Sequence, residues 1–265
     1  MRIISLASGS KGNAYLVQAG ETTVLVDAGL SGREIERRVQ QAGLLMSDIE
    51  LILLTHEHAD HLRSAAILSK RFDLPVYGTE GTLGTPCGRI KAVAEATPRV
   101  EPMAAGDTLT AGSLTITSFS VSHDAADPVG YVFTANGHKA ALACDIGQAT
   151  RLVVQRLHGV NALILESNHC PTMLSDGPYP YWLKRRIAGA QGHLSNDDAG
   201  LLLRDVFHDD LRYLLLAHLS EVNNSPQAAF GCMQQVLTDL SAEIDLRVGQ
   251  QHRIGNWIDL DEETV

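Results

Sequence analysis

The 265-residue sequence has few cysteines, no long hydrophobic run and a shortage of positive charge. Its cysteines form no Cys-x-x-Cys pair and are scattered along the chain, at Cys87, Cys144, Cys170 and Cys232. This spacing argues against a disulfide framework or a thiolate metal site. No apolar stretch reaches the length of a membrane span, and the first residues lack a secretory pattern. We therefore expect a cytoplasmic protein without membrane contact.

The charge balance restricts the partners that the chain can bind. Lysine and arginine number 21 against 31 aspartates and glutamates, a formal net charge of −10. Such an excess disfavours binding of nucleic acid over the whole surface. A nuclease stays compatible, because bound divalent metals add local positive charge and a basic patch can guide a phosphate backbone. The run Lys184-Arg185-Arg186 is the clearest patch, with a solvated helix face as the alternative.

The strongest positive signal is a dense group of metal-binding side chains. Three histidines and one aspartate, His56, His58, Asp60 and His61, directly follow the apolar run 49–54, which predicts a buried strand. Alternate residues of an extended segment face the same way, so His56 and His58 can bind one metal. A turn into a helix would carry Asp60 and His61 to a second metal. Imidazole with carboxylate suits zinc, manganese or iron, and solvated imidazoles in a polar turn explain so dense a group poorly.

Three later residues stand at the ends of other apolar or β-rich runs. They are His123 after 113–121, Asp145 after 139–144 and His218 after 211–217. Strand ends expose side chains on a rigid scaffold, which suits catalysis. Taken singly, Asp145 can also be a turn residue, and His218 a hydrogen-bonded histidine at the rim of the site.

This motif, followed in order by the three later residues, resembles the metallo-β-lactamase superfamily. The resemblance implies a four-layer αβ/βα sandwich with the metal site at the edge of two sheets, and two divalent ions, Zn²⁺ or Mn²⁺. Asp27, in Asp27-Ala28-Gly29, matches an early signature whose aspartate usually orients the metal-binding loop; a plain turn aspartate is the alternative. The implied ligands are His56, His58 and His123 for one metal, Asp60, His61 and His218 for the other, and Asp145 as the bridge.

Several segments are similar to one branch, the YycJ/WalJ-like proteins, which are relatives of tRNase Z. These segments are Leu6–Asn13, His123–Tyr131, Glu166–His169, Gly192–Asn196 and His218–Asn224. The similarity runs nearly end to end, which implies a single domain over residues 1–265 without an inserted cap domain. It also implies an exonuclease that acts from the 5′ end, with DNA favoured over RNA as substrate.

The expected chemistry assigns roles to a few residues. Two metals about 3.5–4 Å apart can lower the pKa of bound water toward roughly 7 and clamp a phosphodiester. Asp60 or Asp145 can hold the resulting hydroxide in line. His193 is the candidate acid for the departing alkoxide, since it resembles the histidine of the tRNase Z Gly-His-Ser motif, and Glu166 matches that histidine's glutamate partner. The alternative is that His193 merely precedes a helix that is capped by Ser195.

Other polar residues are candidates for substrate contact or support. Ser8, Ser10 and Asn13 lie in a glycine-containing turn that can present N–H groups to a phosphate or buttress the site; a plain turn between strands is the alternative. His169 either touches substrate phosphate or lines the rim of the pocket. The segment 80–107, with three basic residues, can shape access of the substrate.

Hydrophobic periodicity predicts a β-rich start followed by alternating helices and strands, which suits a layered α/β protein. The predicted strands are 2–7, 14–18, 22–27, 49–54, 75–79, 113–121, 129–135, 138–144, 161–166 and 211–217. The predicted helices are 32–42, with Ser31 as N-cap, 62–71, 149–157, 178–188, 195–206 and 225–240.

Two other functions compete with the nuclease. The same site would serve a hydrolase of a small phosphodiester or other ester, which the acidic composition favours. A di-iron redox protein or a metal-binding module without hydrolytic activity is a third class. It is disfavoured because related di-iron proteins typically replace one of the motif histidines by a carboxylate, and this chain keeps all three.

Overall fold

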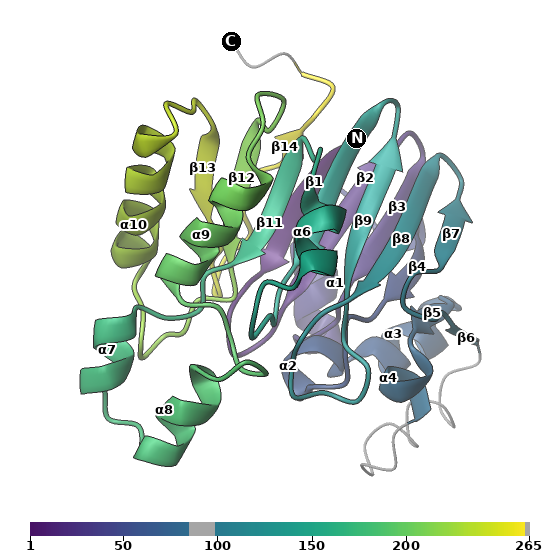
Figure 1. The fold of residues 1–265 in the computed structure, drawn as a ribbon. Coiled ribbons are helices and arrows are strands. Elements are labelled where there is room, and N and C mark those ends of the chain that lie inside the picture. Colours follow the sequence, from purple (N-terminus) through teal and green to yellow (C-terminus); the bar gives the residue numbers. More distant parts are fainter. Residues whose placement is uncertain (85–98, 263–265) are drawn as a thin grey trace.

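A computed structural model describes residues 1–84 and 99–262, and it contains two seven-stranded sheets (Figure 1). In spatial order the first sheet consists of β14 (Ile258–Asp259), β1 (Arg2–Ala7), β2 (Ala14–Ala19), β3 (Thr22–Val26), β4 (Ile49–Leu53), β5 (Val76–Gly78) and β6 (Val100–Pro102). The second consists of β13 (Asp245–Val248), β12 (Tyr213–Ala217), β11 (Ala162–Glu166), β10 (His138–Ala143), β9 (Val129–Ala135), β8 (Leu114–Ser120) and β7 (Thr108–Ala111).

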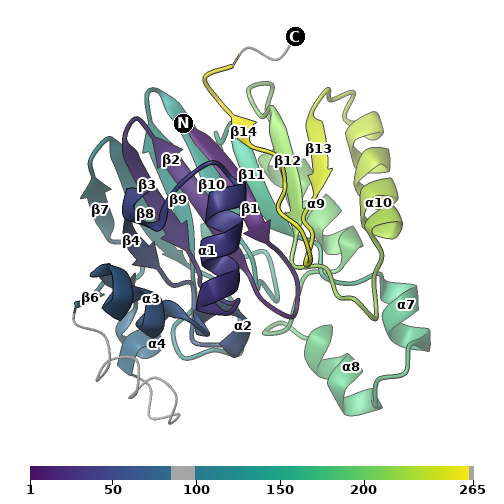
Figure 2. The ribbon, with the colours of Figure 1, turned by 180° about the vertical axis from the view of Figure 1, so that it is seen from behind.

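Helices cover the outer faces of both sheets or lie at one edge of the sandwich (Figures 1 and 2). They are α1 (Gly32–Gln41), α2 (Ala59–Leu62), α3 (Ala65–Phe72), α4 (Glu80–Gly84), α6 (Arg151–Leu157), α7 (Pro171–Asp176), α8 (Tyr181–Ile187), α9 (Asn196–Val206), α10 (Pro226–Asp239) and the 3₁₀ turn η1 (Met46–Asp48). Of these described helices, none is both long and apolar enough to span a membrane.

The layers follow from the alternation of side chains along each strand. In β2, Tyr15 and Val17 enter the core between the two sheets, whereas Leu16 packs into the core under α1 and α3. In β11, Ile164 faces the other sheet, and Leu163 packs against the helices α6, α9 and α10. Because both faces of each sheet are buried, these strands are mostly hydrophobic, and their polar residues Gln18 and Glu166 lie at or near the strand ends. The predicted four-layer sandwich is confirmed.

Strand direction places the candidate site at one edge of the sandwich. Strands β3 to β6 run parallel to one another, as do β10 to β13. Parallel strands end at the same edge of a sheet, so the residues that follow β3, β4, β10 and β12 meet there. Helices α2, α7 and α8 lie at this lower edge in both views (Figures 1 and 2).

Most predicted elements are present, but two helices differ and several short elements were not predicted. The expected helix 62–71 is divided into α2 and α3 at Ser64, whose backbone is not helical (φ −117°, ψ 5°). The helix expected over 178–188 begins only at Tyr181, after Pro180. The helices α4 and α7, the turn η1 and the strands β6, β7, β13 and β14 were not predicted. Of the three basic residues in 80–107, Arg89 and Lys91 lie outside the described residues, whereas Arg99 directly precedes β6.

Candidate metal centre

The loop after β4 changes direction at His58, after which α2 begins at Ala59, three residues earlier than the expected start at Leu62. His58 is the N-cap of α2, with an extended backbone at φ −64° and ψ 147°. The side chains of His56 and His58 therefore project from the extended segment, while those of Asp60 and His61 project from the first turn of the helix. His56 and His61 are buried, and His58 and Asp60 are half-buried. One short segment thus presents ligand atoms to two neighbouring positions.

Asp27 holds this loop in place. Its Oδ1 accepts hydrogen bonds from the backbone N–H of Thr55 (2.9 Å) and from the Thr55 hydroxyl (3.1 Å). Its Oδ2 lies 2.7 Å from Nδ1 of His61, which donates to it. The Thr55 hydroxyl also lies 3.0 Å from Nδ1 of His56. Thr55, which sequence reasoning missed, therefore links both histidines to Asp27.

Hydrogen bonds fix the tautomer of most of the clustered histidines. Nδ1 of His56 and of His61 are engaged as described, and Nδ1 of His123 lies 2.9 Å from the carbonyl oxygen of Gly192. Nδ1 of His218 lies 2.8 Å from Oε1 of Glu166. An imidazole that donates through Nδ1 keeps the lone pair on Nε2 for a metal. His58 is the exception, since its Nδ1 faces Nε2 of His123 at 3.3 Å.

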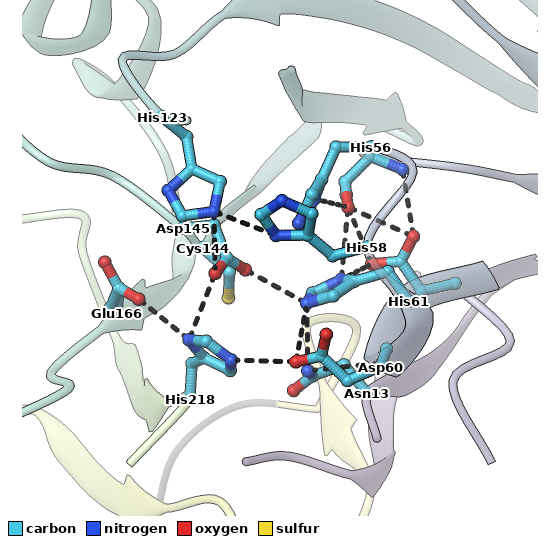
Figure 3. A network of polar contacts seen from close by, with 12 residues as sticks. Asn13, His56, His58, Asp60, His61, His123, Cys144, Asp145, Glu166 and His218 are labelled. Carbon is cyan, nitrogen blue, oxygen red and sulfur yellow. Dashed lines mark hydrogen bonds and ion pairs between the residues drawn. The ribbon is translucent and has the colours of Figure 1, made fainter. Parts of the chain in front are cut away.

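Asp145 lies between the two predicted ligand sets (Figure 3). Its Oδ2 is 3.1 Å from Nε2 of His61, and its Oδ1 is 3.6 Å from Nε2 of His123. Oδ1 also lies 3.3 Å from Nδ1 of His218. The carboxylate of Asp145 thus contacts members of both predicted sets, His123 in one and His61 and His218 in the other, which is the position expected of a bridging ligand.

Three residues of the site have a left-handed backbone, which is uncommon for residues other than glycine. They are Asp27 (φ 59°), Asp145 (φ 54°) and His218 (φ 55°). Asp27 and His218 directly follow strands β3 and β12, and one residue separates Asp145 from the end of β10. Such conformations cost free energy and persist where the surrounding structure holds them, often at functional sites. Here the abrupt turn lets each side chain project from the edge of its sheet.

Glu166 orients two histidines, one of which sequence reasoning did not assign to it. Its Oε1 lies 2.8 Å from Nδ1 of His193 and 2.8 Å from Nδ1 of His218. Its Oε2 accepts hydrogen bonds from the backbone N–H groups of Ile146 and Leu194. Burial opposes ionisation of this carboxyl, but the contacts with His193 and His218 lower its pKa to about 2. The buried carboxylate is therefore ionised and fully hydrogen-bonded.

Electrostatics divide the histidines into two classes. Burial lowers the pKa of His56 well below its ordinary value, and it also lowers that of His123, so burial favours the neutral form of both imidazoles. Burial alone would do the same for His218, but Asp145, Asp60 and Glu166 raise its pKa to about 10. The carboxylates of the site therefore favour a positive charge at this position.

The residues fit divalent metal ions. Two triads, His56–His58–His123 and Asp60–His61–His218, each have ligand atoms within 4.8 Å of one another. Two further groups meet the same distance, His56–His61–Asp145 and Asp145–Glu166–His193–His218. The buried Nε2 of His56 makes no hydrogen bond in the structure. A buried polar atom without a partner is costly, and a metal would supply the missing contact. Imidazole and carboxylate donors suit zinc or manganese.

The glycine-containing turn before β2 contacts two predicted ligands, His218 and His61, through hydrogen bonds. The Ser8 hydroxyl accepts hydrogen bonds from the backbone N–H of His218 (2.8 Å) and from the Tyr15 hydroxyl (2.9 Å). The side-chain amide of Asn13 is buried and lies 3.0 Å from Nε2 of His61. Ser10 is exposed. Ser8 and Asn13 are therefore placed to buttress the ligands.

His169 lies beside the centre and not within it. It is buried next to the first turn of α9, its Nδ1 makes no hydrogen bond, and burial lowers its pKa. Among the described residues it belongs to none of the groups whose atoms converge for a metal. Contact with substrate phosphate remains our expectation for His169, alongside a role at the rim.

Removing the metals is expected to destabilise the folded protein. A ligand at about 100 times its Kd contributes roughly 2.7 kcal/mol, and each kcal/mol shifts Tm by about 2–4 °C in a protein of this size. Chelation followed by dialysis should therefore lower Tm by about 5–10 °C, and elemental analysis before chelation should give two ions per chain. An unchanged Tm and no bound metal after reconstitution would contradict a dinuclear centre.

Replacing Asp27 by asparagine is expected to weaken metal binding without unfolding the chain. Asparagine keeps the shape and tolerates the left-handed backbone, but it removes the charge that orients His61. Loss of such a supporting carboxylate typically costs about 10- to 100-fold in metal affinity, which competition with a chromogenic chelator would measure. Asp73→Asn is the matched control, because Asp73 is exposed and has nearly the same backbone (φ 55°). Equal affinities in both variants would remove Asp27 from the site.

Comparison with known proteins agrees with this geometry. The family model for the beta-lactamase superfamily domain matches residues 22–219. The chain is 42% identical over 234 residues to exodeoxyribonuclease YycJ of Bacillus anthracis, covering 88% of each chain. It is 32% identical over 254 residues to exodeoxyribonuclease WalJ of Streptococcus pneumoniae, covering 92% of this chain and 91% of that protein.

The solved structures support the predicted relation to tRNase Z at the level of the fold. Human tRNase Z, short form, superposes with a TM-score of 0.62 over 96% of this chain and 98% of that chain. At 14% identity this likeness shows the fold alone. Together with the matches in sequence, it means that this chain belongs to the β-lactamase superfamily, in the family that contains the exodeoxyribonucleases YycJ and WalJ.

Proposed function

We propose that the chain is a dinuclear metal-dependent phosphodiesterase that trims DNA from the 5′ end, with residues 1–265 forming one such domain. One observation carries the proposal: a histidine held by a buried glutamate, His193 on Glu166, stands beside two convergent ligand triads. The triads suit hydrolysis in general, whereas a held acid suits a poor leaving group such as a nucleotide alkoxide. The similarity to YycJ and WalJ supports DNA as the substrate.

The predicted ligands keep the roles that their positions suit. His56, His58 and His123 would hold one ion, Asp60, His61 and His218 the other, and Asp145 both. When bound, two divalent ions supply hydroxide at neutral pH and neutralise charge on the phosphate. Asp60 and Asp145 face this space and can accept a hydrogen bond from the attacking nucleophile, which holds it in line.

His193 would protonate the leaving group. Burial alone would lower its pKa, but the charge and the hydrogen bond of Glu166 raise it above the ordinary value for histidine. Glu166 therefore favours the protonated form of the imidazole. Its Nδ1–H donates to Glu166, so the other ring nitrogen, Nε2, carries the proton that can be transferred. With one fifth of its side chain exposed, His193 is reachable by substrate.

The test is an assay of metal-reconstituted protein on end-labelled DNA and RNA, single- and double-stranded, beside a nitrophenyl phosphodiester and a β-lactam. Metal-dependent shortening of DNA from the 5′ end, absent in Asp60→Ala, is the expected result. If only RNA is shortened, the proposed DNA substrate is wrong. If DNA is shortened from the 3′ end, the proposed polarity is wrong.

A hydrolase of small phosphodiesters is the second candidate, because the net charge of −10 repels a long polyanion. Turnover of the nitrophenyl substrate with no polynucleotide degraded would establish this candidate and remove the exonuclease. Cleavage of the β-lactam alone would contradict both, since neither candidate breaks an amide bond.

A further inference from the structure

The segment 171–190, which contains α7 and α8, carries an unusual group of exposed aromatic rings; we call this segment the arm. The chain has only two tryptophans, six tyrosines and five phenylalanines. Three aromatic residues lie within a stretch of four positions in the arm: Tyr179, Tyr181 and Trp182. The side chains of Tyr181 and Trp182 are 74% and 67% exposed, and the other large exposed hydrophobic residues in the described part of the chain are aliphatic. Burial against a core does not account for these rings.

Basic side chains share the helix with the rings. Lys184, Arg185 and Arg186 follow directly, in a chain whose acidic residues outnumber its basic ones by ten. The guanidinium of Arg185 lies over the ring of Tyr181, 5.9 Å from its centroid. Within residues 1–84 and 99–262, Arg186 is the one of the three that forms an ion pair with a carboxylate. Lys184 donates to the carbonyl oxygen of Ser175. Helix α8, none of whose residues is buried, therefore presents flat aromatic faces beside positive charge.

The arm is fastened to the metal centre. Arg186 pairs at 2.5 Å with Asp124, whose neighbour in sequence is the predicted ligand His123. The Ser122 hydroxyl donates to the carbonyl oxygen of Ala190. The backbone N–H of His193 donates to the carbonyl oxygen of Ile187. Both views place α7 and α8 at the same edge of the sandwich as α2, the helix that contains Asp60 and His61 (Figures 1 and 2). A molecule bound on α8 is thus held in a fixed relation to the site.

The turn after α8 allows no side chain at Gly192. A Cβ there would lie 2.1 Å from the carbonyl oxygen of Ile187 and 2.2 Å from that of Arg186. The carbonyl oxygen of Gly192 in turn accepts the hydrogen bond from His123. The same compact turn therefore positions the end of the arm and one predicted ligand.

We propose that α8 is a docking surface for an unpaired nucleic-acid strand, with bases stacked on Tyr181 and Trp182 and phosphates contacted by Lys184 and Arg185. This inference rests on the proposed function and names how its substrate is held. Every base has a flat face, so stacking tolerates any sequence, as an exonuclease requires. Paired bases bury those faces in the duplex, so the surface selects single strands. It also gives an acidic protein a local grip on a polyanion.

The test is binding of a fluorescent oligothymidylate with phosphorothioate linkages to the metal-loaded protein, followed by anisotropy. Trp182→Ala should raise the Kd about tenfold, equivalent to about 1.4 kcal/mol, within the range for base stacking on aromatic side chains. Arg185→Ala should reduce the slope of log Kd against log salt by about one contact. Leu201→Ala, which removes an aliphatic side chain of similar exposure, and Arg33→Ala, which removes an exposed arginine of α1, are matched controls.

Fluorescence gives a second readout that loss of folding cannot imitate. The chain has two tryptophans, and the indole N–H of Trp257 donates to Ala42 while Trp182 is exposed. In a Trp257→Phe background, the oligonucleotide should quench the emission of Trp182, and a duplex of the same length should quench it less. If α8 instead binds a protein or a membrane, adding the oligonucleotide should leave the emission of Trp182 unchanged.

The outcomes separate this inference from the proposed function. If the wild type degrades DNA while Trp182→Ala binds and degrades it equally well, the docking surface is wrong and the exonuclease stands. If the oligonucleotide binds and quenches Trp182 but no nucleic acid is cleaved, the surface stands and the exonuclease is wrong. If the wild-type protein shows no binding and no quenching, the docking surface is wrong, whatever substrate the metal site hydrolyses.

Discussion

Replacing Asp145 by alanine is expected to remove at least one of two metal ions and to abolish hydrolysis. Its carboxylate contacts both predicted ligand sets, at 3.1 Å from His61 in one and 3.6 Å from His123 in the other. Alanine leaves both positions one ligand short, and two cations close together lose the negative charge between them. The rate should fall by more than the roughly 10- to 100-fold typical of residues that only orient ligands. Elemental analysis and turnover of a nitrophenyl phosphodiester measure the two effects.

A second variant separates ligation from folding. Alanine at a left-handed backbone is strained, so Asp145→Ala alone could lose activity through the chain conformation. Asparagine tolerates that conformation and keeps the size of the side chain, but it lacks the charge. Asp145→Asn should therefore keep the melting behaviour of the metal-free protein and still bind fewer than two ions. Two tightly bound ions and the full rate in this variant would refute the bridging role.

Much of the fold and most of the candidate site follow from local sequence. His56, His58, Asp60 and His61 lie close in sequence, and the apolar run before them identifies the strand that ends there. Asp145 and His218 were found because each follows a run hydrophobic enough to be a strand buried on both faces. Position at a strand end is a local property, and parallel pairing then brings distant strand ends together.

The parts that were missed depend on contacts between distant segments. Glu166 touches both His193 and His218, and nothing in the spacing indicates the second contact. Strand β13 contains Asp245 and Arg247, which pair with each other, so it lacks a hydrophobic run and forms through pairing with β12. Helix α7 is short and follows Cys170 without a side-chain cap, so its sequence has little helical signal.

The shared contact of Glu166 also has a consequence for the mechanism. His218 and His193 bind the same oxygen, so the position of a predicted metal ligand and that of the proposed acid depend on one carboxylate. Because Glu166 also accepts the backbone N–H groups of Ile146 and Leu194, its carboxylate has little freedom to move. The site thereby keeps a fixed distance between the ligand set and the proton donor, whichever substrate is bound.

Replacing His193 by alanine should retain both metals yet slow phosphodiester hydrolysis by about 10²–10⁴-fold, the range for general acid catalysis. The imidazole lies outside the two predicted ligand triads, although it converges with Asp145, Glu166 and His218, and it is held by Glu166, which raises its pKa. Its proton matters most when the departing oxygen is a strong base. A nitrophenyl phosphodiester, whose leaving group departs without a proton, should therefore lose far less rate than an oligonucleotide.

The comparison of the two leaving groups distinguishes proton donation from a structural role. His208→Ala is the matched control, because it deletes a half-buried histidine that bonds to the carbonyl oxygen of Val160, away from the metal centre. It should leave both rates and the metal content unchanged. Equal losses on both substrates in His193→Ala would mean that His193 binds substrate or supports the site. A deficit confined to the alkoxide leaving group, with two ions still bound, is the result that only a proton donor explains.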